Sequence, residues 1–180
     1  MMSLLKNFDY SKFKKDKLPK LNSLETFKEI KQIDRLPENK KFVKDHDNVT
    51  KVFTNIVGAE NKKYIQELLD SSRPIIVSLK KHYNRPRPKV LAKNFDIKLK
   101  DIELDSMKTP SYPSGHSTQG YLVAEMLKEK YPEKAKELDK KAKDISDSRN
   151  IAKAHYKSDS KKGKELGLEM ASFIKQQENG

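Results

Sequence analysis

Apolar residues recur at intervals of three and four along the chain from residue 41 onward. One such stretch covers 41–57 and stops at Gly58, and a second covers 61–69. This spacing gathers apolar side chains on one face of an α-helix and leaves charged residues on the other. The pattern therefore predicts amphipathic helices over 41–57 and 61–69. His46, which lies between two aspartates in the first helix, is expected to pair with charges at the surface.

Proline marks the boundaries of the next helices. Pro74 is suited to a first helical turn, so a separate helix is predicted over 74–83. Pro86 and Pro88 each force extended backbone on the residue before them, which ends this helix. Three more helices are predicted further along the chain, over 117–130, 133–154 and 158–174.

The last predicted helix has two glycines on one face. Ser158 and Asp159 are suited to cap its first turn. Gly163 and Gly167 follow four residues apart, a spacing that places them one above the other on a helix surface. Because no side chain stands at either position, this helix can pack closely on a neighbour.

Residues 89–112 show no sustained period. They are expected to form a long loop with one short strand-like turn near 95–104, and a loop of this length in a compact domain usually serves function. No stretch alternates apolar and polar residues in the way of a half-buried strand. The predicted fold class is therefore all-α.

The N-terminal part differs from the rest. Residues 1–22 are basic and weakly patterned, and Ser23 can cap a short helix that ends near Leu36. We therefore expect a basic N-terminal arm over 1–40, with at most one short helix, and a helical domain over 41–180.

The composition narrows the function classes. The chain has 180 residues, a formal net charge of +13 and no cysteine. The lack of cysteine excludes disulfides, thiolate nucleophiles and cysteine-ligated zinc. A positive field attracts anions such as phosphate esters, nucleic acid or an acidic membrane surface, although the lysines are dispersed and also solvate the surface.

Signals for export or membrane insertion are not evident in the sequence. The first 20 residues have no signal-peptide pattern, and the longest aliphatic runs are too short to span a bilayer. The expected protein is soluble and cytoplasmic, with no integral membrane segment.

The most informative chemistry lies at 148–159. His155 and Asp159 are four residues apart, close enough for the carboxylate to accept a hydrogen bond from one ring nitrogen. That bond would fix the tautomer and leave the other nitrogen free to attack or to take a proton. Arg149 adds a planar fork that suits a pair of phosphate oxygens. A buried ion network would use the same residues, so a phosphoryl-transfer site needs more anion ligands and a proton donor.

A pair of cations is the first source of further ligands. Lys80 stands near a predicted helix end, and Arg87 follows in a turn that prolines make rigid. Two cations held together repel each other unless a bound polyanion offsets the repulsion. A solvated basic helix end is the simpler explanation of the same two residues.

The sequence Pro-Ser-Gly-His at 113–116 is the second source. Gly115 permits close approach of the backbone to an anion, and Ser114 adds a hydroxyl donor. His116 is placed where an imidazolium would protonate a departing oxygen. An ordinary junction between a loop and a helix, with a serine cap, accounts for this motif equally well.

Together the three clusters resemble the tripartite signature of the superfamily of type-2 phosphatidic acid phosphatases, class A acid phosphatases and vanadium haloperoxidases. Every specified position is filled, in order: Lys80, Arg87 and Pro88, then Pro113, Ser114, Gly115 and His116, then Ser148, Arg149, His155 and Asp159. The pair Ser111 and Tyr112, just before the second motif, resembles the corresponding pair in the soluble class A enzymes. Pro110 stands where those enzymes often have glycine. The resemblance covers about 42–175 and implies a single-domain helical bundle of the acid phosphatase/vanadium haloperoxidase type.

The resemblance also implies a mechanism. The protein would be a metal-independent phosphatase that hydrolyses phosphomonoesters, with diphosphates as a further substrate class, through a phosphohistidine intermediate. His155 would attack phosphorus, Asp159 would orient it, and His116 would protonate the leaving alkoxide and then activate water. Five residues would bind the phosphate: Lys80, Arg87, Ser114, Gly115 and Arg149. Neither a metal nor a cofactor is expected, because the cations neutralise the phosphate.

Two other functions stay open. The same residues would hold vanadate in a haloperoxidase, although the known enzymes of that kind are much longer chains. The net charge also suits a basic nucleic-acid-binding module without catalysis, but no recognised motif with interleaved aromatic residues supports one. The expected partner is a small phosphate ester of unspecified identity, and the soluble relatives weakly favour a homo-oligomer.

Overall fold

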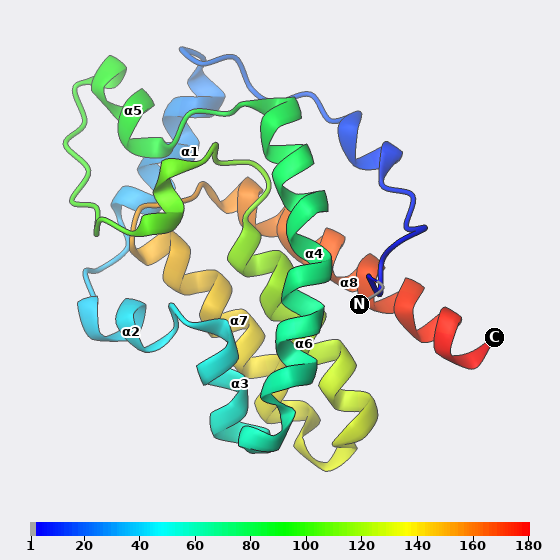
Figure 1. Ribbon diagram of the computed structural model, residues 1–180. Helices are drawn as coiled ribbons and strands as arrows, with labels where there is room; N and C mark the ends of the chain where they lie inside the picture. Colours follow the sequence, from blue (N-terminus) through cyan, green and yellow to red (C-terminus); the bar gives the residue numbers. More distant parts are fainter. Residues whose placement is uncertain (1–2) are drawn as a thin grey trace.

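The computed structural model describes residues 3–180, and over that range it contains helices and no strand (Figure 1). This confirms the predicted all-α fold class. The first two residues of the predicted arm lie outside the described part. The α-helices are α1 (Leu24–Asp34), α2 (Lys40–Asp45), α3 (Val49–Val57), α4 (Lys62–Tyr83), α5 (Pro88–Ala92), α6 (Gly115–Lys130), α7 (Ala135–Ile151) and α8 (Lys157–Asn179). Short 3-10 turns lie at Ser11–Lys14, Ala59–Asn61, Lys93–Phe95, Asp105–Lys108 and Pro132–Lys134.

Helix α6 forms the centre of the bundle and packs against α4, α7 and α8 (Figure 1). Leu122, Val123 and Leu127 of α6 are completely buried, and the hydrophobic core extends from them into the neighbouring helices. Full burial of side chains of this size stabilises a fold by about 1.5–3 kcal/mol each. The core therefore fixes the relative positions of the helix ends that carry the three sequence motifs.

The two glycines of α8 bring its backbone against that of α6. A Cβ atom on Gly163 would lie 2.6 Å from the carbonyl oxygen of Ser114, and one on Gly167 would lie 2.4 Å from that of Thr118. Both separations are shorter than van der Waals contact. The predicted close packing is confirmed, and the neighbour is the helix that begins within the second motif.

The helix predicted over 41–57 is two helices, so that prediction was wrong. Helix α2 ends at Asp45, and the side chain of Asn48 accepts a hydrogen bond from the backbone N–H of Lys51 at 3.0 Å to start α3. Asparagine is a preferred residue at the N-cap of a helix. Its side-chain hydrogen bond to the backbone starts a new helix here in place of a continuous one. His46 is buried at the corner rather than at the surface, with Nδ1 2.7 Å from the carbonyl oxygen of Phe42.

The helices predicted on either side of Pro74 are one helix, and that prediction was also wrong. Helix α4 runs from Lys62 to Tyr83 without a break. Pro74 cannot bond to the carbonyl of Asp70, but both residues are exposed, so water can satisfy that carbonyl. Ile75 and Ile76 continue the buried face beyond the proline. No helix within residues 3–180 is long and apolar enough to cross a membrane.

The segment predicted as a loop over 89–112 contains the rest of α5 and two 3-10 turns, but no strand-like turn near 95–104. Pro88 occupies the first turn of α5, a position suited to proline, and Arg87 immediately precedes it. Helix α6 begins two residues earlier than expected, because the side chain of Ser114 caps it.

The described part of the N-terminal segment packs on the main core. Leu5, Phe8 and Phe13 are buried, and the ring of Phe8 lies edge-on to Phe173 of α8, with 5.6 Å between the ring centroids. These contacts hold the segment across α4 and α8. The hydroxyl of Tyr112 also donates to Oδ2 of Asp16, which places this segment beside the second motif.

Gly167→Ala is expected to destabilise the protein by about 1–3 kcal/mol, because the added methyl overpacks the contact between α8 and α6. Gly120→Ala is the matched control, since a Cβ there would lie 3.4 Å from Cγ2 of Ile145, an ordinary contact. Alanine is also favoured over glycine in a helix interior by about 1 kcal/mol. Urea unfolding of both variants measures the difference, and equal midpoints would contradict the close contact.

Candidate active site

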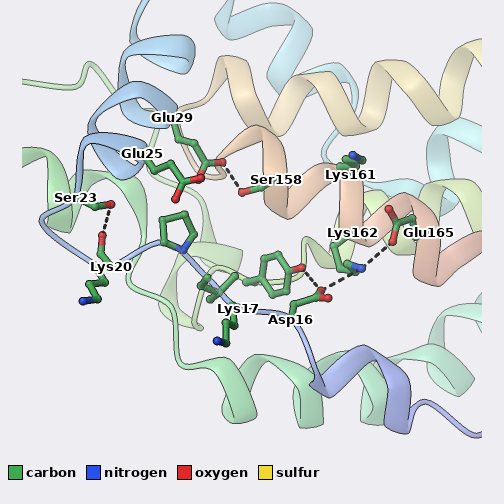
Figure 2. A pocket seen from close by; sticks show the side chains of 13 residues that line it. Asp16, Lys17, Lys20, Ser23, Glu25, Glu29, Ser158, Lys161, Lys162 and Glu165 are labelled. Atoms are coloured by element: carbon green, nitrogen blue, oxygen red, sulfur yellow. Dashed lines mark hydrogen bonds and ion pairs between the residues drawn. The ribbon is translucent and has the colours of Figure 1, made fainter.

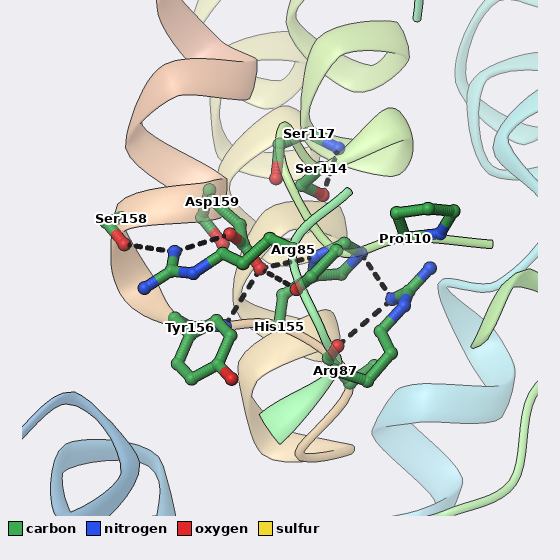
Figure 3. A network of polar contacts seen from close by, with 12 residues as sticks. Arg85, Arg87, Pro110, Ser114, Ser117, His155, Tyr156, Ser158 and Asp159 are labelled. Atoms are coloured by element: carbon green, nitrogen blue, oxygen red, sulfur yellow. Dashed lines mark hydrogen bonds and ion pairs between the residues drawn. The ribbon is translucent and has the colours of Figure 1, made fainter. Parts of the chain in front are cut away.

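The three predicted clusters come together around the N-terminal ends of α6 and α8 (Figure 3). Ser114 of the second cluster donates its backbone N–H to the carbonyl oxygen of Asp159 in the third, at 3.0 Å. Arg87 of the first cluster contacts His155 of the third. The contributing segments are the last turn of α4, the turn before α5, the first turn of α6, the end of α7, the connection 152–156 and the first turn of α8.

His155 is buried and bonded through both ring nitrogens (Figure 3). Its Nδ1 lies 2.9 Å from Oδ2 of Asp159, and its Nε2 lies 2.9 Å from Nη1 of Arg87. A carboxylate only accepts and a guanidinium only donates, so Nδ1 carries the proton and Nε2 presents its lone pair. The neutral tautomer with a nucleophilic Nε2 is therefore fixed by its neighbours.

The surroundings of His155 disfavour its charged form. Burial lowers the pKa of His155 well below 6.5, and the positive charges of Arg87, Lys80 and Arg149 act in the same direction. The ring therefore stays neutral, and Nε2 stays nucleophilic, into the acid range.

The carboxylate of Asp159 is completely buried and accepts four hydrogen bonds. Its Oδ2 accepts from His155, from the hydroxyl of Ser111 and from the backbone N–H of Tyr156. Its Oδ1 accepts from Nη1 of Arg85 at 2.8 Å. Burial raises the pKa of Asp159 to about 6, while Arg85 and the Ser111 hydroxyl lower it and keep the group ionised near neutral pH.

Arg87 connects His155 with the segment before α6. Its Nε donates to the carbonyl oxygen of Thr109 at 2.8 Å, and its Nη1 also donates to that of Ala154 at 3.0 Å. Its Nη2 donates to the carbonyl oxygen of Ser106 and to the hydroxyl of Thr109. The prolines on either side restrict the backbone of this turn, so the guanidinium is held beside Nε2.

Lys80 lies inside the site rather than on a solvated helix end. Its side chain is buried, and its ammonium donates to the carbonyl oxygen of Pro110 at 2.7 Å. Burial and, to a smaller extent, the charge of Arg87 lower the pKa of Lys80 to about 7, against a smaller opposing effect of Asp159. A buried amine with so low a pKa gains its full charge most readily beside a bound anion.

Arg149 has a donor group without a partner among the described residues. Its side chain is completely buried, its Nη1 donates to Oδ1 of Asp47 at 3.1 Å, and its Nε donates to the hydroxyl of Ser148 at 3.2 Å. Its Nη2 is buried and makes no hydrogen bond to any residue in 3–180. Leaving a charged donor buried and unpaired costs more than about 1–3 kcal/mol, so this atom favours an anion as its partner.

The start of α6 offers backbone donors to the same place. The side chain of Ser114 accepts from the backbone N–H of Ser117 at 3.2 Å, and Gly115 is the first residue of the helix. The N–H groups of a first helical turn have no partner within the helix and attract anions. A Cβ on Gly115 would meet Cγ2 of Ile76 at 3.5 Å and Cε of Lys80 at 3.9 Å, both ordinary contacts, so the protein itself has room for a side chain there.

His116 is held by the corner between α2 and α3. Its Nε2 donates to the backbone carbonyl oxygen of Asp47 at 2.8 Å and lies 3.6 Å from Oδ1 of the same residue. Burial lowers the pKa of His116 to about 4, as does the charge of Arg149, while Asp47 raises it. Asp47 therefore contacts both the proton-donor candidate and one phosphate-ligand candidate.

The sequence reasoning missed Asp47 and Arg85 as residues of this site. Asp47 precedes Asn48, whose preference for a helix cap was the available signal for a corner at this point. Arg85 stands in the same proline-rich turn as Arg87, which was the only hint of its position. Ser111 was noticed only through the family resemblance, and its bond to Asp159 was not foreseen. Over residues 3–180, no three histidine, aspartate or glutamate side chains are grouped to hold a metal ion.

A helical bundle in which a tautomer-fixed histidine, a second histidine and buried cations converge offers a site suited to a phosphate group. No protein-family model matches the chain. The non-specific acid phosphatase of Salmonella typhimurium is 35% identical over 130 residues, which cover 67% of this chain and 52% of that protein. The non-specific acid phosphatase of Salmonella typhi is 33% identical with the same coverage. The chain spans about half the length of these curated relatives, and its predicted relationship to the class A acid phosphatases is confirmed.

Asp47→Asn is expected to lower the pKa of His116 further, because the negative charge that favours its protonated form is lost while the backbone acceptor stays. The ring protons of His116 report this pKa in an NMR titration. Asp45→Asn is the control, since Asp45 is exposed and pairs only with Lys41 among the described residues. An unchanged titration of His116 in Asp47→Asn would argue against this contact.

Proposed function

We propose that the protein is a metal-independent phosphatase that hydrolyses phosphomonoesters, and diphosphates as a second class, through a phosphohistidine at His155. The observation that carries the proposal is the fixed tautomer of His155, with Nδ1 bonded to Asp159 and Nε2 facing Arg87. The relatives are named non-specific acid phosphatases, which supports a broad choice of ester. The proposed partner is thus a small phosphate ester. A cytoplasmic location and a homo-oligomer stay predictions.

The phosphate would be bound by charge and by backbone donors. Lys80, Arg87 and Arg149 would surround its equatorial oxygens, with the unpaired Nη2 of Arg149 as one donor. The hydroxyl of Ser114 and the N–H of Gly115 would add neutral donors at the helix start. Each charge-assisted hydrogen bond contributes about 1.5–3 kcal/mol, and more where the transition state gathers charge.

The first chemical step would transfer the phosphoryl group to His155. A phosphate oxygen takes over the hydrogen bond that Arg87 now donates to Nε2, which frees the lone pair for attack. The bond from Nε2 to phosphorus forms while the bond from phosphorus to the ester oxygen breaks. The departing alkoxide takes a proton from His116, and Asp159 stabilises the cationic imidazole that results.

The second step would return the enzyme to its starting state. Neutral His116 removes a proton from water, and the water oxygen attacks phosphorus. The bond from phosphorus to Nε2 breaks, inorganic phosphate leaves, and His155 recovers its lone pair. The two histidines thus have different tasks, with Asp159 beside one and Asp47 beside the other.

His155→Ala is expected to lower kcat for a chromogenic phosphate monoester by at least about 10³-fold, because the nucleophile is lost. The assay contains EDTA, and wild-type activity is expected to persist in it. His82→Ala, at an exposed histidine of α4, is the matched control. With an ester that is radiolabelled in its phosphate group, rapid quenching in base should trap the labelled phosphohistidine on the wild-type protein and not on His155→Ala. Equal rates for the wild-type and His155→Ala proteins would exclude His155 as the nucleophile.

The value of kcat/KM is expected to be highest below pH 7 and to fall as the pH rises. Above pH 7 Lys80 loses its charge, since its pKa is about 7, and His116, with a pKa of about 4, is largely deprotonated already and can no longer donate. His155 withstands acid because its pKa is well below 6.5. A profile over pH 3–9, corrected for ionisation of the ester, measures this. A rate that climbs through pH 8 would contradict the role of charged Lys80 as a phosphate ligand.

A further inference from the structure

Arg85 lies on the opposite side of Asp159 from His155 (Figure 3). The residue is only 4% exposed, and its Nη1 donates to Oδ1 of Asp159 and to the hydroxyl of Ser158, both at 2.8 Å. Its guanidinium carbon stacks 3.8 Å from the ring centroid of Tyr156. A guanidinium fixed by two hydrogen bonds and an aromatic face has little freedom to leave the carboxylate.

The second amino group of the Arg85 guanidinium is bonded to Glu29 of α1. Its Nη2 lies 2.7 Å from Oε2 of Glu29, and the hydroxyl of Ser158 donates to the second oxygen of the same carboxylate (Figure 2). Glu29, Arg85 and Ser158 thus form a closed ring of hydrogen bonds that leads to Asp159. We call these three residues the clamp.

Helix α1 is docked firmly enough to place Glu29. Ser23 caps the helix by accepting from the backbone N–H of Thr26 at 3.2 Å, as predicted. Ile30 and Ile33 are completely buried against a cluster that includes Tyr156. Glu29 is largely buried but lines a cavity of about 790 Å³ between the N-terminal segment and α8 (Figure 2).

The charges of the clamp suit a histidine that becomes cationic. One guanidinium is shared between two carboxylates, those of Glu29 and Asp159, so Arg85 does not neutralise Asp159 completely. The remaining negative charge is available to His155 when its ring gains positive charge on phosphorylation. Without Glu29, Arg85 would pair with Asp159 alone and compete with His155.

We propose that Glu29 and Arg85 are positioning residues for Asp159, so that α1 completes the active site through the clamp. This inference rests on the proposed role of His155 as nucleophile. Neither residue touches the substrate, and both act through the orientation and charge of Asp159. The functional part of the chain then includes α1, not only the region that carries the three motifs.

The test compares Glu29→Gln and Arg85→Gln with matched controls. Glu25→Gln changes an exposed glutamate one turn earlier on α1, and Arg73→Gln changes an exposed arginine of α4. We expect kcat to fall about tenfold in Glu29→Gln and further in Arg85→Gln, with KM nearly unchanged, as for groups that orient a site ligand. Both controls should keep wild-type rates.

The pH profile separates positioning from a merely structural role. The charged and titratable groups that face Asp159 are Arg85, Lys80, Arg87, His155, Tyr112 and Tyr156. Arg85→Gln removes a charge that lowers the pKa of Asp159, so the acid limb of kcat should move to higher pH. Glu29→Gln removes a charge of the opposite sign, so the limb should move to lower pH. Two variants that were only less stable would not move it in opposite directions.

The remaining outcomes separate the positioning role of the clamp from the proposed role of His155 as nucleophile. If Arg85→Gln does not fold, Glu29→Gln and Ser158→Ala carry the comparison, with the Nδ1 proton resonance of His155 as a readout that needs no turnover. That resonance should shift in both clamp variants and stay in Glu25→Gln. Identical kcat, acid limb and resonance in Glu29→Gln and Glu25→Gln would overturn the positioning role. Equal hydrolysis by the wild-type and His155→Ala proteins would instead overturn the proposed function.

Discussion

The hydrogen bonds that converge on the carboxylate of Asp159 join three segments that lie far apart in the sequence. The turn before α5 reaches it through Arg85, the segment before α6 through Ser111, and the connection 152–156 through His155. An ionised group is tolerated in a protein interior only when its lone pairs are satisfied. Burying this one carboxylate therefore requires all three segments to be in place, and the site forms only when the whole bundle has formed.

The buried cations are arranged under the same constraint. Lys80, Arg87 and Arg149 are held by the oxygens of Pro110, Thr109 and Asp47 respectively. These contacts hold the three side chains in place before any anion arrives. In the proposed reaction, a site organised in this way would not have to reorient its dipoles, and such preorganisation is usually the largest electrostatic contribution to catalysis.

What could be predicted from the sequence depends on how far apart along the chain the interacting residues lie. Motif positions and the central helices could be predicted, because spacing and periodicity are local properties. The unbroken course of α4 could not, since it depends on Pro74 facing solvent. The contacts of Asp47 with Arg149 and of Glu29 with Arg85 join residues 102 and 56 positions apart, and no local pattern records them.

The contact of Gly163 with the carbonyl oxygen of Ser114 has a consequence for the precision of the site. Ser114 begins the helix of the second motif, and Asp159 stands one turn before Gly163 in the helix of the third. Main chain rests on main chain here, with no side chain between. The distance between the helix starts that carry His116 and Asp159 therefore does not depend on the rotamer of any side chain packed between them.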